Sequence, residues 1–235
     1  MKKYTKKQFK EEEEKKMYKK ANTLKRIILF FLGVFIIQLG VAIFLKTNIG
    51  SDPFTVFTQG LSFLINTTPG KANMIILLVT TVLIIIFDRK KIKIGTIICA
   101  VGVGPIIDVC INLTANLPVD SLNIVLKSII LILGCFLIAV GFSILSATNV
   151  GVAPNDIVPF IIQDKLKFEY RWIRIALDLT YFVLGALLGG VFGVGTIIAV
   201  VTTGPFIQFC LPYGEKFVQL IVDCKSSEEA DTLEA

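Results

Sequence analysis

The 235-residue sequence contains no histidine, so it lacks the commonest metal ligand and the commonest general base near neutral pH. It also has no CxxC pair, no Gly-x-Ser-x-Gly motif and no phosphate-binding Gly-Lys-Ser/Thr motif. Any proton chemistry would have to use carboxylates, and these form no paired catalytic pattern in a polar setting. We therefore expect no enzyme activity, no metal site and no cofactor.

Charged residues are also scarce. They make up 18% of the chain, against 54% hydrophobic residues, and the mean hydropathy is +0.76. A soluble domain carries more charge and less apolar sequence, so this composition indicates an integral membrane protein. The five cysteines fall at positions 99, 110, 135, 210 and 224, four of them inside apolar segments, where a thiol acts as a small packing residue.

The positive charge is concentrated at the N-terminus. Residues 1–26 contain 11 of the 24 Lys and Arg residues, so the net charge of +6 belongs mainly to a tail. We expect this segment to be a solvated cytoplasmic tail, with attraction to anionic lipid headgroups as the functional alternative and no binding of nucleic acid. The apolar run that follows is long enough to remain in place as a membrane span.

Six apolar runs are long enough to cross the hydrocarbon of a bilayer, which takes roughly 20 helical residues. They lie at about 27–46, 72–88, 94–114, 124–146, 172–190 and 194–213. Two further apolar segments, at about 53–65 and 154–164, are too short to span fully. The sequence thus predicts an all-α polytopic membrane protein with membrane segments 27–114 and 124–213 and a cytoplasmic C-terminal tail at 214–235.

The membrane region contains an internal repeat. Thr-Asn-Ile-Gly-Ser-Asp-Pro at 47–53 returns as Thr-Asn-Val-Gly-Val-Ala-Pro at 148–154. Ile-Gly-Thr-Ile-Ile at 94–98, with Gly-Pro at 104–105, returns as Val-Gly-Thr-Ile-Ile at 194–198, with Gly-Pro at 204–205. Transporters commonly place a central site where two such repeats meet, often on broken helices.

The short segments decide how the two repeats are oriented. If each enters and returns on one side, every repeat has three spans and the second repeat is inverted; if each crosses, the repeats have four spans and are parallel. With both termini inside, the inverted arrangement leaves only Lys46, Lys71 and Lys127 outside, whereas the parallel one moves the cluster at 89–93 outside. The positive-inside tendency and the segment lengths favour the inverted arrangement.

Each short segment follows a helix-break pattern. Asn48, Gly50 and Pro53 recur as Asn149, Gly151 and Pro154, and such residues are typical of a helix end followed by a new helix start. A broken backbone at membrane depth must be buried in protein or line a watered cavity, where a helix N-terminus can hold an anionic or polar group. The alternative is a simple interfacial turn between helices.

The second recurring element predicts a kinked helix with a polar side chain. Gly104-Pro105 is followed by Asp108, and Gly204-Pro205 by Gln208. Proline removes a backbone hydrogen bond, and an ionisable group within a span is costly and commonly functional. Asp108 is our first candidate for a coupling or substrate carboxylate; pairing with a polar neighbour is the alternative.

Other polar residues are weaker candidates. Asp52 and Asp156 lie at the starts of the two short segments, where a carboxylate can cap a helix or serve a site. Asp178 follows Arg174 by four residues, which indicates an ion pair along one helix. Gln38 lies in the first long span. The glycine run at 185–195 indicates close helix packing or a homodimer interface.

Read together, Gly40 to Pro53, Gly95-Thr96 and Gly104-Pro105 resemble the bacterial YczE/YyaS/YitT family of integral membrane proteins, over about residues 27–213. In that family the first break element is typically similar to Gly-Val-Ser-Pro-Trp-Asp, and Thr55 here replaces its acidic position, which the second copy keeps as Asp156. The resemblance implies a multi-pass protein of the bacterial inner membrane, and it implies neither a substrate nor a site residue.

The leading hypothesis is a small-solute secondary transporter in which the short helices and the Gly-Pro helices surround a cavity at mid-membrane. The second hypothesis is a non-transporting scaffold or accessory protein, whose basic tail recruits a cytoplasmic partner or anionic lipid. The expected partners are thus the lipid bilayer, an unidentified small solute and a second copy of the chain.

Overall fold

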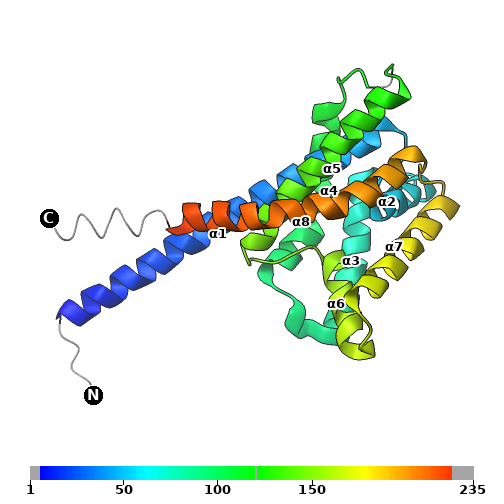
Figure 1. Ribbon diagram of the computed structural model, residues 1–235. Coiled ribbons are helices and arrows are strands. Elements are labelled where there is room, and N and C mark those ends of the chain that lie inside the picture. The colour runs from blue at the N-terminus through cyan, green and yellow to red at the C-terminus, as the bar shows by residue number, and fades with distance from the viewer. Residues whose placement is uncertain (1–5, 120, 224–235) are drawn as a thin grey trace.

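All regular structure in the described part of the chain is helical. The computed structural model describes residues 6–119 and 121–223, so Cys224 and most of the expected C-terminal tail lie outside it. The helices, shown in Figure 1, are α1 (Lys6–Thr47), α2 (Pro53–Leu64), α3 (Pro69–Asp88), the 3₁₀ helix η1 (Arg89–Lys91), α4 (Ile94–Thr114), α5 (Ile124–Ala147), α6 (Pro154–Leu166), α7 (Tyr170–Leu187) and α8 (Val194–Asp223). The prediction of an all-α protein is confirmed for these residues.

Five helical segments are long and apolar enough to cross a membrane. They are Asn22–Thr47, Pro69–Lys91, Ile94–Thr114, Ile124–Ala147 and Val194–Val222. The sixth expected span, at about 172–190, corresponds to α7, which is helical but has three charged residues among its 18 and is not among the five. The structure thus supports a multi-pass membrane protein with one span fewer than the sequence predicts.

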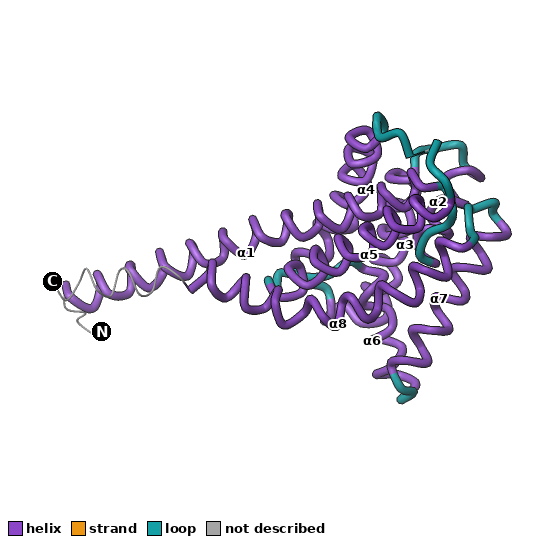
Figure 2. Tube along the Cα trace, turned by 45° about the horizontal axis from the view of Figure 1, so that its top comes forward, coloured by secondary structure: helices purple, strands orange, loops and turns teal. Residues whose placement is uncertain are grey.

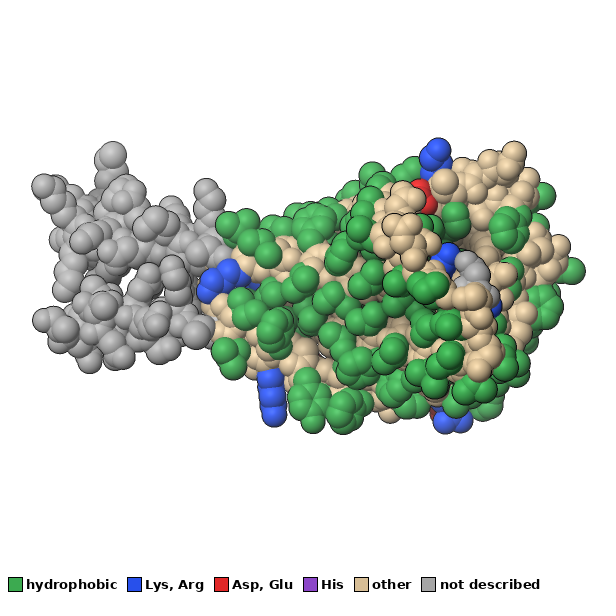
Figure 3. All heavy atoms as spheres, turned by 90° about the horizontal axis from the view of Figure 1, so that it is seen from above, with side chains coloured by type: hydrophobic (Ala, Val, Ile, Leu, Met, Phe, Trp, Pro, Cys, Tyr) green, Lys and Arg blue, Asp and Glu red, His purple; other side chains and the backbone are tan. Residues whose placement is uncertain are grey.

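The apolar exterior suits a lipid environment. Large aliphatic side chains stand outward along several helices; Ile86 on α3 and Ile94 on α4, for example, are 69% and 76% exposed. Figure 3 shows apolar side chains spread over one face of the molecule, with few Lys and Arg side chains among them. In water such a surface would promote aggregation, whereas in hydrocarbon it carries no such penalty.

Helices α1 and α5 cross in direct backbone contact. A β-carbon on Gly40 would lie 2.7 Å from the Gly134 carbonyl oxygen, and one on Gly141 would lie 2.7 Å from the Gly33 carbonyl oxygen. Because the earlier glycine of α1 meets the later glycine of α5, the two helices run antiparallel. Small residues let membrane helices approach this closely, where van der Waals packing replaces the hydrophobic effect as the driving force.

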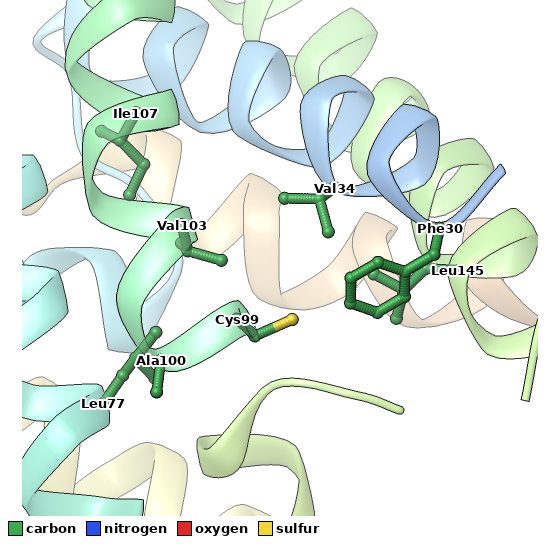
Figure 4. Close-up of a cluster of buried hydrophobic side chains, with 8 residues drawn as sticks. All are labelled: Phe30, Val34, Leu77, Cys99, Ala100, Val103, Ile107 and Leu145. Carbon is green, nitrogen blue, oxygen red and sulfur yellow. The ribbon is translucent and has the colours of Figure 1, made fainter. Parts of the chain in front are cut away.

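The main apolar cluster joins α1, α3, α4 and α5. Figure 4 shows its members: Phe30, Val34, Leu77, Cys99, Ala100, Val103, Ile107 and Leu145. Cys99 packs among these side chains, and Cys110, Cys135 and Cys210 are also buried and free. The four described cysteines therefore have the packing role that the sequence predicts.

Two further contacts join the halves of the chain: α2 packs on α7, and α6 packs on α3. Within the second half, α8 packs on α5. The start of α1 and the end of α8 lie towards the same end of the molecule (Figure 2). From near the middle of α1, the Lys25 ammonium donates a hydrogen bond of 2.7 Å to the Ile221 carbonyl of α8. α8 continues to Asp223, beyond the boundary at 213 that the sequence suggests, and both α4 and α8 run continuously through their Gly-Pro elements.

Candidate functional site

Two breaks in the helical structure follow α1 and α5. α1 ends at Thr47 and α2 begins at Pro53, while α5 ends at Ala147 and α6 begins at Pro154. Asn48 and Asn149 adopt left-handed backbone conformations, with φ of 54° and 57°, which Asn tolerates better than most residues. These turns release the chain from each long helix and direct it into a short one.

Each break lies against the start of the last helix of the other half. The Gly195 N–H donates a hydrogen bond of 2.9 Å to the Ile49 carbonyl, and the Gly95 N–H donates one of 3.2 Å to the Val150 carbonyl. The first copy of the break element thus contacts the second copy of the Gly-Thr element, and the second copy of the break element contacts the first copy of the Gly-Thr element. These bonds satisfy carbonyl groups that a broken helix would otherwise leave unpaired.

Asp52 and Asp156 lie at the starts of the two short helices. The Asp52 carboxylate accepts hydrogen bonds of 3.2 Å from the backbone N–H groups of Phe54 and Thr55, which makes it the N-cap of α2. Asp156 lies in the first turn of α6, whose N-cap, Ala153, offers no side-chain hydrogen bond. Both carboxylates therefore stand at the positive end of a helix dipole.

Arg174 on α7 joins these two acidic positions into one cluster. Its guanidinium is 3.3 Å from the Asp156 carboxylate and 3.3 Å from the Asp178 carboxylate, so the ion pair expected between Arg174 and Asp178 is confirmed. Within the described residues Asp52 forms no ion pair with Arg174, but its charge interacts through space with those of Arg174 and Asp178. We call Asp52, Asp156, Arg174 and Asp178 the charged cluster.

The charged cluster has more carboxylates than its guanidinium can balance. With three aspartates ionised against Arg174, its formal charge is −2. Excess negative charge in a low-dielectric setting is relieved by protonation or by a bound cation. Tyr181 lies one turn beyond Asp178 on α7 and forms an aromatic wall beside the cluster, with ring centroids 5.3 Å from Phe54 and 5.9 Å from Phe57. Carboxylates beside aromatic rings are groups that attract a cation or a small polar solute.

A second polar spot lies between α1, α2, α3 and α4. A small cavity there is lined by Val41, Leu45, Thr55, Thr58, Gln59, Pro69, Asn73 and Ile107. Within the described residues, the Thr58 hydroxyl and the Asn73 side-chain oxygen have no hydrogen-bond partner, although both residues are more than nine-tenths buried. Such oxygens are satisfied by a species that donates to them, for which water is the smallest choice.

Asp108, our first candidate from the sequence, lies on α4, and its carboxylate contacts the N-terminus of α3. Its carboxylate accepts hydrogen bonds of 3.0 Å from the Gly70 N–H and 2.7 Å from the Thr68 hydroxyl. The structure therefore assigns it the alternative role, pairing with a polar neighbour, and its contacts do not place it in the charged cluster. Of the other candidates, Gln38 is buried in α1 and Gln208 stands on the exposed face of α8.

Replacing Asp108 by Ala should destabilise the protein without changing the charged cluster. Two donors at the start of α3 lose their acceptor, which we expect to lower the free energy of unfolding by about 1–2 kcal/mol. Thermal melting of the purified protein in detergent measures this. Asp88→Ala, at the other end of the same helix and without a side-chain cap hydrogen bond, is the matched control and should melt close to wild type. Unchanged melting of Asp108→Ala would contradict the capping role.

A further ion pair joins the end of α6 to η1, which follows α3. Lys91 contacts the Asp164 carboxylate and also donates a hydrogen bond of 3.0 Å to the Phe160 carbonyl. The hydrogen bond from Lys91 holds the pKa of Asp164 below its usual range. Since a depressed carboxylate pKa contributes stability above the unfolded-state value, this link weakens only as acid protonates Asp164.

Sequence reasoning missed the role of Arg174 as a bridge. The four-residue spacing to Asp178 pointed to a local pair, but Asp156 lies 18 residues earlier, on another helix, and nothing in the spacing indicates that contact. Tyr181 was missed as well, because a single tyrosine in an apolar run gives no signal of its own.

Comparison with known proteins agrees with the helical membrane architecture. Residues 24–212 match the model of a family of unknown function, DUF6198. The chain belongs to this family. Two relatives come from Bacillus subtilis (strain 168): the uncharacterized membrane protein YczE is 28% identical over 82% of this chain and 88% of its own length, and the uncharacterized protein YyaS is 27% identical over 79% and 92%. An uncharacterized protein of Haemophilus influenzae is 24% identical over 79% of this chain and 82% of its own.

The DUF6198 match spans the helices from the first span to most of α8 and thus contains the whole charged cluster. The resemblance to YczE-like and YyaS-like proteins that the sequence suggests is confirmed. No solved structure matches the chain.

Proposed function

We propose that this DUF6198 protein is a small-solute secondary transporter of the bacterial inner membrane that works without ATP hydrolysis. The observation that carries the proposal is the ion pair of Arg174 with Asp156, from one helix break, with Asp52, from the other break, near enough to interact electrostatically with the same guanidinium. Charged groups inside a membrane protein are costly, face the interior or a watered cavity, and mark solute or ion pathways. Two carboxylates paired with one guanidinium, and a third near it, further favour a cycle in which a proton or cation binds together with the solute.

In this proposal the two halves, 27–114 and 124–213, are inverted repeats with both termini in the cytoplasm. The antiparallel contact of α1 with α5 supports the inversion, because these helices occupy equivalent places in the two halves. The exchanged hydrogen bonds, Gly195 to Ile49 and Gly95 to Val150, support a two-fold relation between them. Rocking of one half against the other would then open the charged cluster to each side in turn.

A second candidate function is a non-transporting scaffold that recruits a cytoplasmic partner or anionic lipid. One observation favours it: 11 of the 24 Lys and Arg residues lie within the first 26 positions, and the family match begins only at residue 24. A helical basic segment of this kind is attracted to anionic membranes and acidic partners. The scaffold would need no solute site, so the two functions predict different behaviour for the same variants.

The deciding experiment is solute uptake into proteoliposomes. Solutes are first chosen by their ability to raise the melting temperature of the purified protein, and uptake is then measured under an imposed proton or sodium gradient. Deletion of residues 2–25 should leave uptake intact, whereas Asp156→Asn should reduce it by about tenfold or more because the cluster loses a charge. Asp164→Asn is the matched control, a carboxylate of the same helix that lies at its exposed end, and should stay within about twofold of wild type.

Uptake by Asp156→Asn at the wild-type rate would remove the charged cluster from the mechanism. Two results together would identify the scaffold instead. The protein would take up none of the solutes, and deletion of residues 2–25 would abolish its cellular phenotype although the chain still inserts.

A further inference from the structure

Gly104 and Asp108 on α4 show how the Gly-Pro-x-x-polar element acts when another helix packs against it. A β-carbon on Gly104 would lie 2.4 Å from the Gly70 carbonyl oxygen, so α3 rests on the glycine in backbone contact. Asp108, one turn later, accepts a hydrogen bond from the Gly70 N–H of the same helix. The glycine thus provides the close approach and the polar residue provides the hydrogen bond that holds the docked helix.

The same element on α8 has no helix docked on it within the described chain. Beyond its own turn of helix, no described atom lies within 4 Å of a β-carbon placed on Gly204, and both Gly204 and Gln208 are exposed. α8 is also the least covered span: 22% of its most apolar stretch is buried, against 39–44% for the other four. The face of α8 that carries Ile197, Val201, Gly204 and Gln208, at helical spacing, is therefore open. We call it the α8 face.

Lipid alone is a poor partner for this face. Gln208 stands in an apolar run, and the next charged residue, Glu215, is seven positions later, about 10 Å along the helix. A side-chain amide at this depth loses its hydrogen bonds to water, which favours a hydrogen bond to another helix. Gln208 both donates and accepts, so the group that satisfies it best is another amide at the same depth.

We infer that the α8 face is a homodimer interface, in which Gly204 lets two α8 helices approach across a two-fold axis and the two Gln208 amides pair. A second copy presents the same glycine and the same amide at the same depth, as an isologous interface requires. The difference between Asp108 and Gln208 agrees with this inference. The Asp108 carboxylate can only accept, which matches the N–H and hydroxyl donors of α3, whereas the Gln208 amide can both donate to and accept from a second amide. The inference stands apart from the transport proposal, because none of the charged cluster lies on α8.

The test is the stoichiometry of the full-length protein in liposomes, measured by single-molecule photobleaching over a range of protein-to-lipid ratios. We expect the wild-type chain to be dimeric, and Gly204→Leu and Gln208→Leu each to weaken dimerisation by about tenfold. Gly102→Leu on α4, where a β-carbon would meet only the Ile98 side chain at 4.0 Å, is the matched control and should dimerise as wild type. Equal melting temperatures of the variants separate lost dimerisation from misfolding.

A cysteine in place of Gln208 on the α8 face distinguishes an interface from a water-filled pathway. Gln208→Cys should form a disulfide-linked dimer on mild oxidation, above the background of the wild-type chain, whose described cysteines are buried. A wild-type monomer at every protein-to-lipid ratio would overturn the inference, as would wild-type dimerisation of both leucine variants. Reaction of the new thiol with a membrane-impermeant reagent, without crosslinking, would assign Gln208 to a solute pathway instead.

Discussion

Gly50→Ala is expected to prevent stable folding of the protein. Gly50 has φ of 116°, a backbone conformation that residues with a β-carbon rarely adopt, at a cost of about 1–3 kcal/mol. A β-carbon there would also lie 2.6 Å from the Thr196 hydroxyl oxygen and 2.8 Å from the Gly193 and Thr196 backbone nitrogens. Relieving these contacts requires the start of α8 to move away, which breaks the hydrogen bond from Gly195 to Ile49.

Two other glycines serve as controls for this substitution. Gly189 also has positive φ, of 86°, but no described atom beyond its chain neighbours lies within 4 Å of a β-carbon placed on it, so Gly189→Ala isolates the backbone strain. Gly102 is an ordinary helical glycine with room for a methyl group, and Gly102→Ala should be neutral or stabilising by up to about 1 kcal/mol. Size-exclusion profiles and melting curves in detergent should show Gly50→Ala as the least stable variant, Gly189→Ala next and Gly102→Ala as the most stable. If Gly50→Ala behaved like Gly189→Ala, the contact between the break and α8 would be loose.

Arg174→Met is expected to have the second largest effect. Without the guanidinium, Asp156 and Asp178 face each other with Asp52 nearby and no opposite charge among these four positions, so they repel or take up protons. Removing one partner of a buried ion pair typically costs about 3–5 kcal/mol, and because the Arg174 side chain is 39% exposed we expect a smaller loss, about 2–3 kcal/mol. Melting curves in detergent measure the loss.

A double-mutant cycle tests whether the charged cluster acts as a unit. Adding Asp156→Asn to Arg174→Met should restore part of the lost stability, with a coupling of about 0.5–3 kcal/mol. Arg171→Met, three residues earlier on α7 and over the Trp172 ring, is the matched control and should cost about 0.5 kcal/mol. Similar losses for the two arginine variants, with additive effects in the cycle, would show that Arg174 is merely a surface cation.

Patterns along the chain predicted the helices well, because each depends on local sequence. Apolar runs of sufficient length gave α1, α3, α4, α5 and α8, and the Asn, Gly and Pro punctuation placed the starts of α2 and α6 at Pro53 and Pro154. α7 was the exception: its apolar residues suggested a span, but Arg171, Arg174 and Asp178 make it too charged to count as one. Arg174 and Asp178 use their charges to form ion pairs within the charged cluster. Hydropathy counts such charges but does not show which residues they pair with.

The candidate site could be predicted only in part, because it depends on pairs of residues far apart in the sequence. Asp52 and Asp156 were identified from their positions at helix starts. The sequence analysis ranked Asp108 above them, on the general rule that a carboxylate within a span is functional. Its actual role is a hydrogen bond with Gly70, at a helix start 38 residues earlier in the sequence. Which polar residues share a neighbourhood is decided by packing, and packing is invisible in a single sequence.

The exchanged hydrogen bonds between the halves have a consequence for biosynthesis. The Ile49 carbonyl receives its N–H donor from Gly195, which is made 146 positions later. At ordinary rates of translation, about 5–20 residues per second, roughly 7–30 s pass between the two. Throughout that interval the emerging first half carries a break whose carbonyl still lacks this donor. The nascent chain must therefore be held by water, lipid headgroups or the insertion machinery until the last helix arrives, and errors in assembly should concentrate in this window.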